Sequence, residues 1–141
     1  MKRKNIGFIC TGNSARSQIA EGFARYYTDK YKRPIEIYSA GSNPTGYIHK
    51  LAIEVMKEKG IDISKQKSKS IKDIPYKNLD IIVTLCSEAS ETCPNFSNQK
   101  VLHWNLLDPA SYRASKTKQL EIFRYVRDII EEKVKDLIFE L

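Results

Sequence analysis

Apolar residues along this chain gather in four short runs separated by polar turns and by longer segments of a different period. The runs cover residues 4–10, 35–40, 79–85 and 100–104, and they are rich in β-branched and aromatic residues. Runs of this length and composition, bounded by turn-forming residues, predict buried β-strands.

Between these runs the apolar positions recur at the spacing of one helix face. The pattern predicts an amphipathic helix over about residues 15–31 and a second helix around residues 51–56 that stops before Gly60. A third helix is predicted over about residues 116–139. Its apolar stripe is interpreted as core packing, not as a partner-binding face, and consists of Leu120, Phe123, Val126, Ile130, Val134 and Leu137.

Strands that alternate with helices predict the α/β class, because right-handed crossovers cover a parallel sheet with helices. We expect one three-layer domain over residues 1–141, with a four-stranded parallel sheet flanked by helices. A chain of this length buries one sizeable core. No linker, repeat or low-complexity segment interrupts it.

Composition narrows the possible functions. The N-terminus starts basic but continues with only about five apolar residues, so we interpret it as a strand and not as a signal peptide. No run approaches the roughly 18 apolar residues of a membrane helix, and we expect a cytoplasmic protein that does not bind membranes. The net charge of +7 is not accompanied by a nucleic-acid-binding signature, so we expect no nucleic acid partner but an attraction for small anions. Residues 64–72, the densest basic stretch, are predicted to be a solvated face or loop, and nothing suggests more than a monomer.

Chemically interesting residues follow the predicted strands. In a parallel α/β sheet, ligands bind beyond the carboxyl ends of the strands. Cys10 ends the first strand, Cys86 follows the third, and Asp108 lies in the loop after the fourth. We therefore expect all three at one edge of the sheet.

The segment after the first strand has the pattern C-x5-R. A loop of small residues that leads into a helix can turn its backbone N–H groups inward and adds the positive end of the helix dipole. Arg16 contributes a planar fork that matches two oxygens of a tetrahedral oxyanion, and Gly12 can take torsions closed to other residues. The predicted oxyanion-binding loop consists of Thr11, Gly12, Asn13, Ser14, Ala15, Arg16 and Ser17.

In this loop Cys10 should be a thiolate nucleophile at neutral pH, with a hydrogen bond from Ser17. Attack on an oxyanion needs an acid that protonates the departing oxygen, and Asp108, held in a turn by Pro109, is the candidate. Taken singly, Cys10 could be a small buried hydrophobe and Asp108 an ordinary turn residue.

The segments "CTGNSARS" and "DPA" resemble the low-molecular-weight protein tyrosine phosphatase superfamily. "VTLCSEASETCP", with Cys86 and Cys93, and "YSAG", "GIDIS" and "HWNLLDPA" resemble its thioredoxin-coupled arsenate reductases. The resemblance covers essentially the whole chain. It implies arsenate as substrate, thioredoxin as external reductant and no bound cofactor.

The electron balance of arsenate reduction also favours the arsenate reductases within this superfamily. Reduction of arsenate to arsenite takes two electrons, and one new disulfide supplies two. Cys10 can attack arsenic, Cys86 can then attack Cys10, and Cys93 can finally attack Cys86, which leaves a Cys86–Cys93 disulfide.

Two other functions stay open. The chain could be a phosphatase of the same fold, although Ala110 and Ser111 follow Asp108-Pro109 where such phosphatases usually have tyrosine, which leaves no aromatic wall. It could also be a non-catalytic anion-binding or thiol-sensing regulator. A zinc site of Cys86, Cys93 and His103 lacks a clear fourth ligand, so we expect no metal; His49 and His103 are interpreted as ordinary half-buried or surface residues.

The resemblance implies that several relatives hold a monovalent cation beside the loop, and Asn13, Glu21 and Ser39 resemble three of its ligands. Lys69 takes the place of the fourth, an aspartate, so its ammonium group is predicted to replace the ion and pair with Glu21.

The segment between Cys86 and Cys93 is predicted to change shape. If it is helical in the reduced protein, the two Cα atoms lie roughly 10 Å apart, whereas a disulfide tolerates about 4.4–6.8 Å. The helix would then have to unwind before the disulfide forms; a static loop with adjacent thiols is the alternative.

Overall fold

The computed structural model describes residues 3–87, 96 and 99–141. Four strands form one parallel sheet in the order β2-β1-β3-β4: β1 Lys4–Cys10, β2 Ile35–Gly41, β3 Ile81–Thr84 and β4 Lys100–His103. All four predicted strands are confirmed. The third strand is shorter than the predicted run of residues 79–85, because Leu79 still belongs to the turn that precedes the strand. The Leu79 side chain packs on the face of the sheet opposite to the three α-helices described next.

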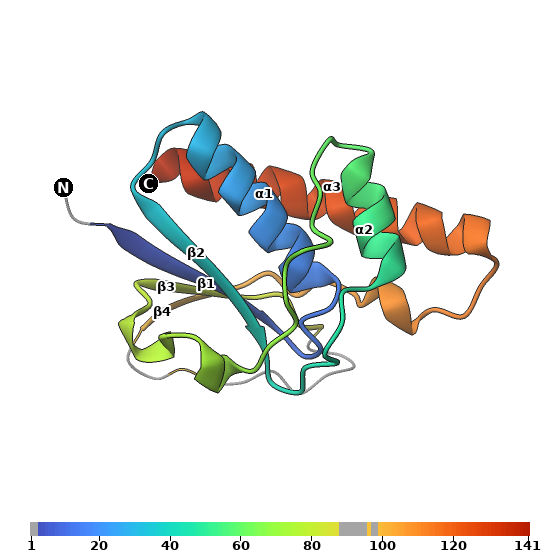
Figure 1. Cartoon of the computed structure of the whole chain (residues 1–141), viewed down its shortest axis with the longest axis horizontal. Coiled ribbons are helices and arrows are strands. Elements are labelled where there is room, and N and C mark those ends of the chain that lie inside the picture. Colours follow the sequence, from blue (N-terminus) through green and yellow to red (C-terminus); the bar gives the residue numbers. More distant parts are fainter. Residues whose placement is uncertain (1–2, 88–95, 97–98) are drawn as a thin grey trace.

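Three α-helices pack together on one face of this sheet (Figure 1). They are α1 Arg16–Lys30, α2 Lys50–Lys57 and α3 Lys116–Glu140. The Ser115 side chain caps α3 by accepting a hydrogen bond from the Lys118 N–H, and Gly60 lies at a φ of +75° just after α2. The three predicted helices are therefore confirmed, with only small differences at their ends.

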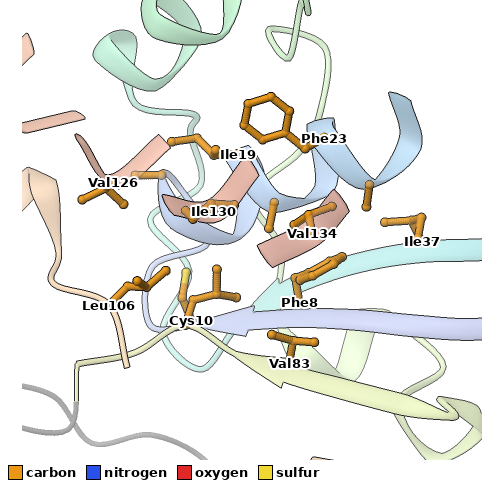
Figure 2. Close-up of a cluster of buried hydrophobic side chains, with 14 of the residues drawn as sticks. Phe8, Cys10, Ile19, Phe23, Ile37, Val83, Leu106, Val126, Ile130 and Val134 are labelled. Atoms are coloured by element: carbon orange, nitrogen blue, oxygen red, sulfur yellow. The ribbon is translucent and has the colours of Figure 1, made fainter. Parts of the chain in front are cut away.

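The main core lies between the sheet and these helices (Figure 2). Phe8 and Cys10 of β1 point towards this side, where Ile19 and Phe23 of α1 are fully buried. The apolar stripe predicted on the last helix is confirmed as core packing, since five of its six residues are buried and Leu120 is partly buried against them; the five are Phe123, Val126, Ile130, Val134 and Leu137.

The opposite face of the sheet is covered by a segment without an α-helix among the described residues. Ile9 and Ile82 pack there against Ile74 and Leu79, which belong to a segment with two short 3-10 turns, η1 Ile71–Asp73 and η2 Tyr76–Asn78. Pro75 stands between the turns and keeps either from extending into a longer helix. Among the described residues, α-helices thus cover one face and 3-10 turns the other. No described helix has the length and apolar character needed to cross a membrane.

Candidate active site

The loop between β1 and α1 is held from outside through its carbonyl groups. Four N–H groups of the segment that follows β2 donate to carbonyl groups of the loop over 2.9–3.2 Å. The donor and acceptor pairs are Ser42 to Cys10, Asn43 to Thr11, Thr45 to Gly12 and His49 to Ser14. A Gln18 side-chain amide donates to a fifth carbonyl group, that of Asn13, at 3.0 Å. Because the N–H and C=O groups of a peptide unit point in opposite directions, the N–H groups of the loop turn inward. The Asn13 N–H accordingly points to the Cys10 sulfur at 3.3 Å. This geometry fits the predicted oxyanion-binding loop.

The left-handed conformation in this loop lies one residue after Gly12. Asn13, with a φ of 47°, takes the left-handed conformation in this loop, and Gly12 does not. Asparagine tolerates that conformation because its side chain is short and forms local hydrogen bonds. The glycine required for close approach is Gly41 at the end of β2, where an added Cβ would lie 2.5 Å from the Thr11 carbonyl oxygen.

Cys10 is buried, with 2% exposure, beneath the first turn of α1 (Figure 2). Its sulfur lies 2.9 Å from the Ser17 hydroxyl, as the sequence suggested. The Ser17 hydroxyl and the Asn13 N–H are thus two hydrogen-bonding groups beside the Cys10 sulfur. The sulfur also lies at the positive, N-terminal end of α1. Both features stabilise a thiolate.

Arg16 is 3% exposed and its guanidinium group is fixed by main-chain oxygens. One terminal nitrogen donates to the carbonyls of Leu85 and Leu106 at 3.0 and 2.9 Å, so the ends of two other segments orient it. The second terminal nitrogen lies 3.8 Å from an Asp108 carboxylate oxygen. The structure therefore brings the predicted clamp and the predicted acid together.

Asp108 begins a short 3-10 turn, η3 Pro109–Ser111, and one carboxylate oxygen accepts the Ala110 N–H at 3.0 Å. The other oxygen is the one near Arg16. The side chain is 32% exposed, so solvent reaches it. A catalytic acid that solvent reaches can exchange its proton with water between turnovers.

A pocket of about 370 Å³ unites these groups. Its lining includes Cys10, Arg16 and Asp108, and also Tyr47 and His49 from the segment between β2 and α2. Ala110, not an aromatic residue, follows Asp108-Pro109, but Tyr47 from a different segment lines the pocket. His49 is half-buried, as predicted, but it borders the pocket, and the sequence showed no signal for this.

Cys86 follows β3 and is as buried as Cys10, at 2% exposure. Both belong to the same apolar cluster, at the carboxyl ends of two neighbouring parallel strands. The predicted common edge for Cys10, Cys86 and Asp108 is thus observed. Cys93 and the predicted switch segment lie outside the described residues, so the helix-to-loop change stays a prediction.

Beneath the loop lies a buried carboxylate. Glu21 of α1 accepts hydrogen bonds from the Ser39 hydroxyl and from Arg25, the latter at 2.9 Å. The ammonium group of Lys69 lies 3.9 Å from the same carboxylate, and burial lowers the pKa of Lys69 while Glu21 raises it. Lys69 is therefore where the sequence placed it, but Arg25 is the closer partner of Glu21. The spacing of four residues between Glu21 and Arg25 on one helix was the available signal.

The basic stretch 64–72 is a loop, as predicted, but it does more than face solvent. The Ser68 hydroxyl donates to the Gly12 carbonyl at 3.1 Å, and the Lys69 N–H donates to the Asn13 side chain at 2.9 Å. Gln18, fully buried, also bonds to the Lys67 carbonyl. These contacts brace the anion loop from behind, and sequence reasoning missed them because they join segments about 50 residues apart.

Comparison with known proteins identifies the family. The profile of the low molecular weight phosphotyrosine protein phosphatase family matches residues 5–141. The chain belongs to this family. It is 41% identical to an arsenate reductase of Bacillus subtilis (strain 168), with 96% of each chain covered, and 44% identical to an arsenate reductase of Staphylococcus aureus (strain Newman), with 93% of each covered. A solved structure described as an arsenate reductase in the phosphate binding state superposes with a TM-score of 0.81 at 35% identity, over 97% of this chain and 98% of the other.

In residues 3–87, 96 and 99–141, no three His, Cys, Asp or Glu side chains gather as they would around a metal ion. His103, one proposed zinc ligand, is exposed and shares a hydrogen bond with the Thr84 hydroxyl. The zinc alternative also requires Cys93, which lies outside these residues.

Proposed function

We propose that this protein reduces arsenate to arsenite, with Cys10 as nucleophile, Cys86 and Cys93 as the redox relay, Arg16 as oxyanion clamp and Asp108 as acid. The observation that carries the proposal is the burial of Cys10 and Cys86 in one cluster at the ends of adjacent strands, with Cys10 inside an anion loop. A phosphatase needs only the first thiol. The similarity to arsenate reductases over nearly the whole chain supports the same function.

In the first step the Cys10 thiolate attacks the arsenic atom, and one arsenate oxygen departs as water. The inward N–H groups and the Arg16 guanidinium group bind the remaining oxygens and offset their negative charge. Asp108 gives its proton to the departing oxygen. The product is a Cys10–arsenic(V) adduct, and no electron has yet been transferred.

In the second step the Cys86 thiolate attacks the Cys10 sulfur. The electron pair of the sulfur–arsenic bond stays on arsenic, which leaves as arsenite, and a Cys10–Cys86 disulfide forms. Cys93 then attacks Cys86 and releases the Cys10 thiolate. One arsenate thus gains two electrons, and the protein loses two electrons in forming the Cys86–Cys93 disulfide.

Thioredoxin is proposed to reduce this last disulfide by dithiol exchange, so no resident cofactor is required. The cycle begins with three reduced thiols and therefore fits a reducing compartment such as the cytoplasm. The same chemistry works in a single chain, in line with the expectation of a monomer.

The test is arsenate-dependent NADPH consumption coupled through thioredoxin and thioredoxin reductase. Serine substitution of Cys10, Cys86 or Cys93 should each abolish turnover. Unchanged turnover in Cys93→Ser would remove the third thiol from the relay. Absence of any turnover in the unmodified protein, with arsenate still bound, would favour a non-catalytic anion-binding or thiol-sensing regulator.

A weak phosphatase activity is the second candidate, because the loop fits phosphate as well as arsenate and Tyr47 borders the pocket. Hydrolysis of an aryl phosphate needs Cys10, Arg16 and Asp108 but no second thiol. Cys86→Ser should therefore keep hydrolysis of p-nitrophenyl phosphate while losing arsenate reduction. Faster aryl phosphate hydrolysis than arsenate reduction in the unmodified protein would make the phosphatase the main function.

A further inference from the structure

A continuous series of hydrogen bonds joins the surface of α1 to the Cys10 sulfur. It begins at Arg25, whose side chain is 54% exposed, and reaches the buried Glu21 carboxylate over 2.9 Å. From there it passes through three buried polar side chains to the thiol: Ser39, Asn13 and Ser17. Every one of these three is fully buried.

Glu21 at one end and the Lys69 N–H beside Asn13 together determine the direction of these bonds. An ionised carboxylate has no proton to donate, so the Ser39 hydroxyl must donate to Glu21. The Ser39 oxygen then accepts the Asn13 side-chain N–H at 3.0 Å. The Lys69 N–H donates to the amide oxygen of Asn13 at 2.9 Å and holds that amide in the matching orientation.

The same amide nitrogen of Asn13 also donates to the Ser17 hydroxyl at 2.7 Å. The Ser17 oxygen is thereby occupied as an acceptor, and its own proton is available for the Cys10 sulfur at 2.9 Å. A thiolate is an acceptor only, so this direction favours the ionised sulfur. Ser39, held as a donor by Glu21, supports the same orientation of Asn13 from the other side.

Arg25 is the cationic partner in direct contact with the Glu21 carboxylate. It lies one helical turn from Glu21, and its guanidinium group is anchored by a second bond, to the Ile37 carbonyl at 2.9 Å. Lys69 is the more distant cation, and its ammonium group already donates to the Lys67 carbonyl. The direct partner of the buried carboxylate is thus a surface arginine outside the pocket.

We infer that Arg25 is a positioning residue for the reaction, which stabilises the Cys10 thiolate through Glu21, Ser39, Asn13 and Ser17. The inference rests on the proposed role of Cys10 as nucleophile. It does not depend on arsenate being the substrate, and this makes a separate test possible.

The test measures the rate of Cys10 alkylation by iodoacetamide at pH 7, with peptide mapping to assign the label. Arg25→Met keeps the length of the side chain but removes its charge, and its rate constant should fall about threefold to tenfold, the range expected for one hydrogen bond. Arg25→Lys keeps the charge and should stay within about twofold of the unmodified protein. Arg3→Gln is the matched control: Arg3 is an exposed arginine that pairs with Glu36 of β2 at 2.8 Å and does not join the series, so its substitution should change nothing.

A pH profile separates this role from a purely structural one. At pH 10 nearly every thiol is ionised, so Arg25→Met and the unmodified protein should react at the same rate. The inference is overturned if Arg25→Met reacts normally at pH 7, if its deficit persists at pH 10, if Arg25→Lys is as slow as Arg25→Met, or if Arg3→Gln loses as much. A protein with normal alkylation behaviour but no arsenate turnover would refute the proposed function and leave this inference intact.

Discussion

The Lys69 N–H donates to the side-chain oxygen of Asn13 at 2.9 Å, while the Lys69 ammonium group lies 3.9 Å from Glu21. One residue thus serves the anion loop twice, because its backbone orients the asparagine and its charge faces the buried carboxylate. Arg25 faces the same carboxylate at 2.9 Å. Two cationic side chains therefore occupy the surroundings of Glu21.

Potassium should have little specific effect on this protein, since the positive charge beside Glu21 is already supplied by side chains. Replacing potassium chloride with choline chloride at fixed ionic strength should change neither the melting temperature nor the turnover rate. Differential scanning fluorimetry and the coupled assay measure both. A large potassium-specific rise in melting temperature would show that an ion still binds there.

Gly41→Ala should destabilise the protein by about 1–3 kcal/mol, as overpacking does. The new Cβ would lie 2.5 Å from a backbone oxygen of the anion loop, which cannot move without disturbing the site. Gly12→Ala is the matched control, because there the nearest contact is a side-chain methyl group of Thr45 at 3.1 Å. Urea unfolding should show a smaller loss for Gly12→Ala; equal losses would contradict the argument.

Arg16→Lys should lower kcat/KM by roughly tenfold to a hundredfold, although the charge is kept. A lysine cannot hold two carbonyls and present a planar fork to an oxyanion at the same time. Steady-state kinetics and phosphate binding by calorimetry measure the effect. Arg33→Lys, at a surface arginine that bonds to the Phe139 carbonyl, should leave both unchanged. Normal kinetics in Arg16→Lys would rule out the clamp.

Acidification should destabilise the protein partly through His49. Its Nδ1 accepts the Leu51 N–H at 3.1 Å and so caps α2, which only the neutral ring can do. Burial lowers the pKa of His49 from its ordinary value of 6.5. The charge of Lys50 lowers this pKa as well, whereas the charge of Asp108 raises it. Because the unfolded chain then binds a proton more readily, stability falls as the pH drops below about 6.5.

Asparagine caps a helix without titrating in this range, so the melting temperature of His49→Asn should improve relative to the unmodified protein between pH 7 and pH 5. His103→Asn, at an exposed histidine away from the pocket, provides the comparison. Thermal melts across that interval decide the matter, and a difference that stays constant with pH would exclude a titrating cap.

Much of the fold and the centre of the site followed from local patterns. The four apolar runs and three periodic segments predicted the strands and helices, because burial of one face leaves a regular spacing in the sequence. Cys10, Arg16 and Asp108 could be placed at one edge since parallel strands end together. The covering of the second sheet face by 3-10 turns was not predicted, because the residues around Pro75 have no clear period.

The sequence by itself thus determined the class of fold and placed Cys10, Arg16 and Asp108 at one edge of the sheet, because each depends on neighbours within a few residues or on strand order. Only the tertiary structure decided that Asn13 and not Gly12 takes the left-handed conformation, that Gly41 and Lys69 brace the loop, and that Tyr47 and His49 border the pocket. It also decided that Arg25 and not Lys69 is the closer partner of Glu21. These contacts join segments far apart in the chain, and their distances depend on how helices and loops pack, which no local spacing records.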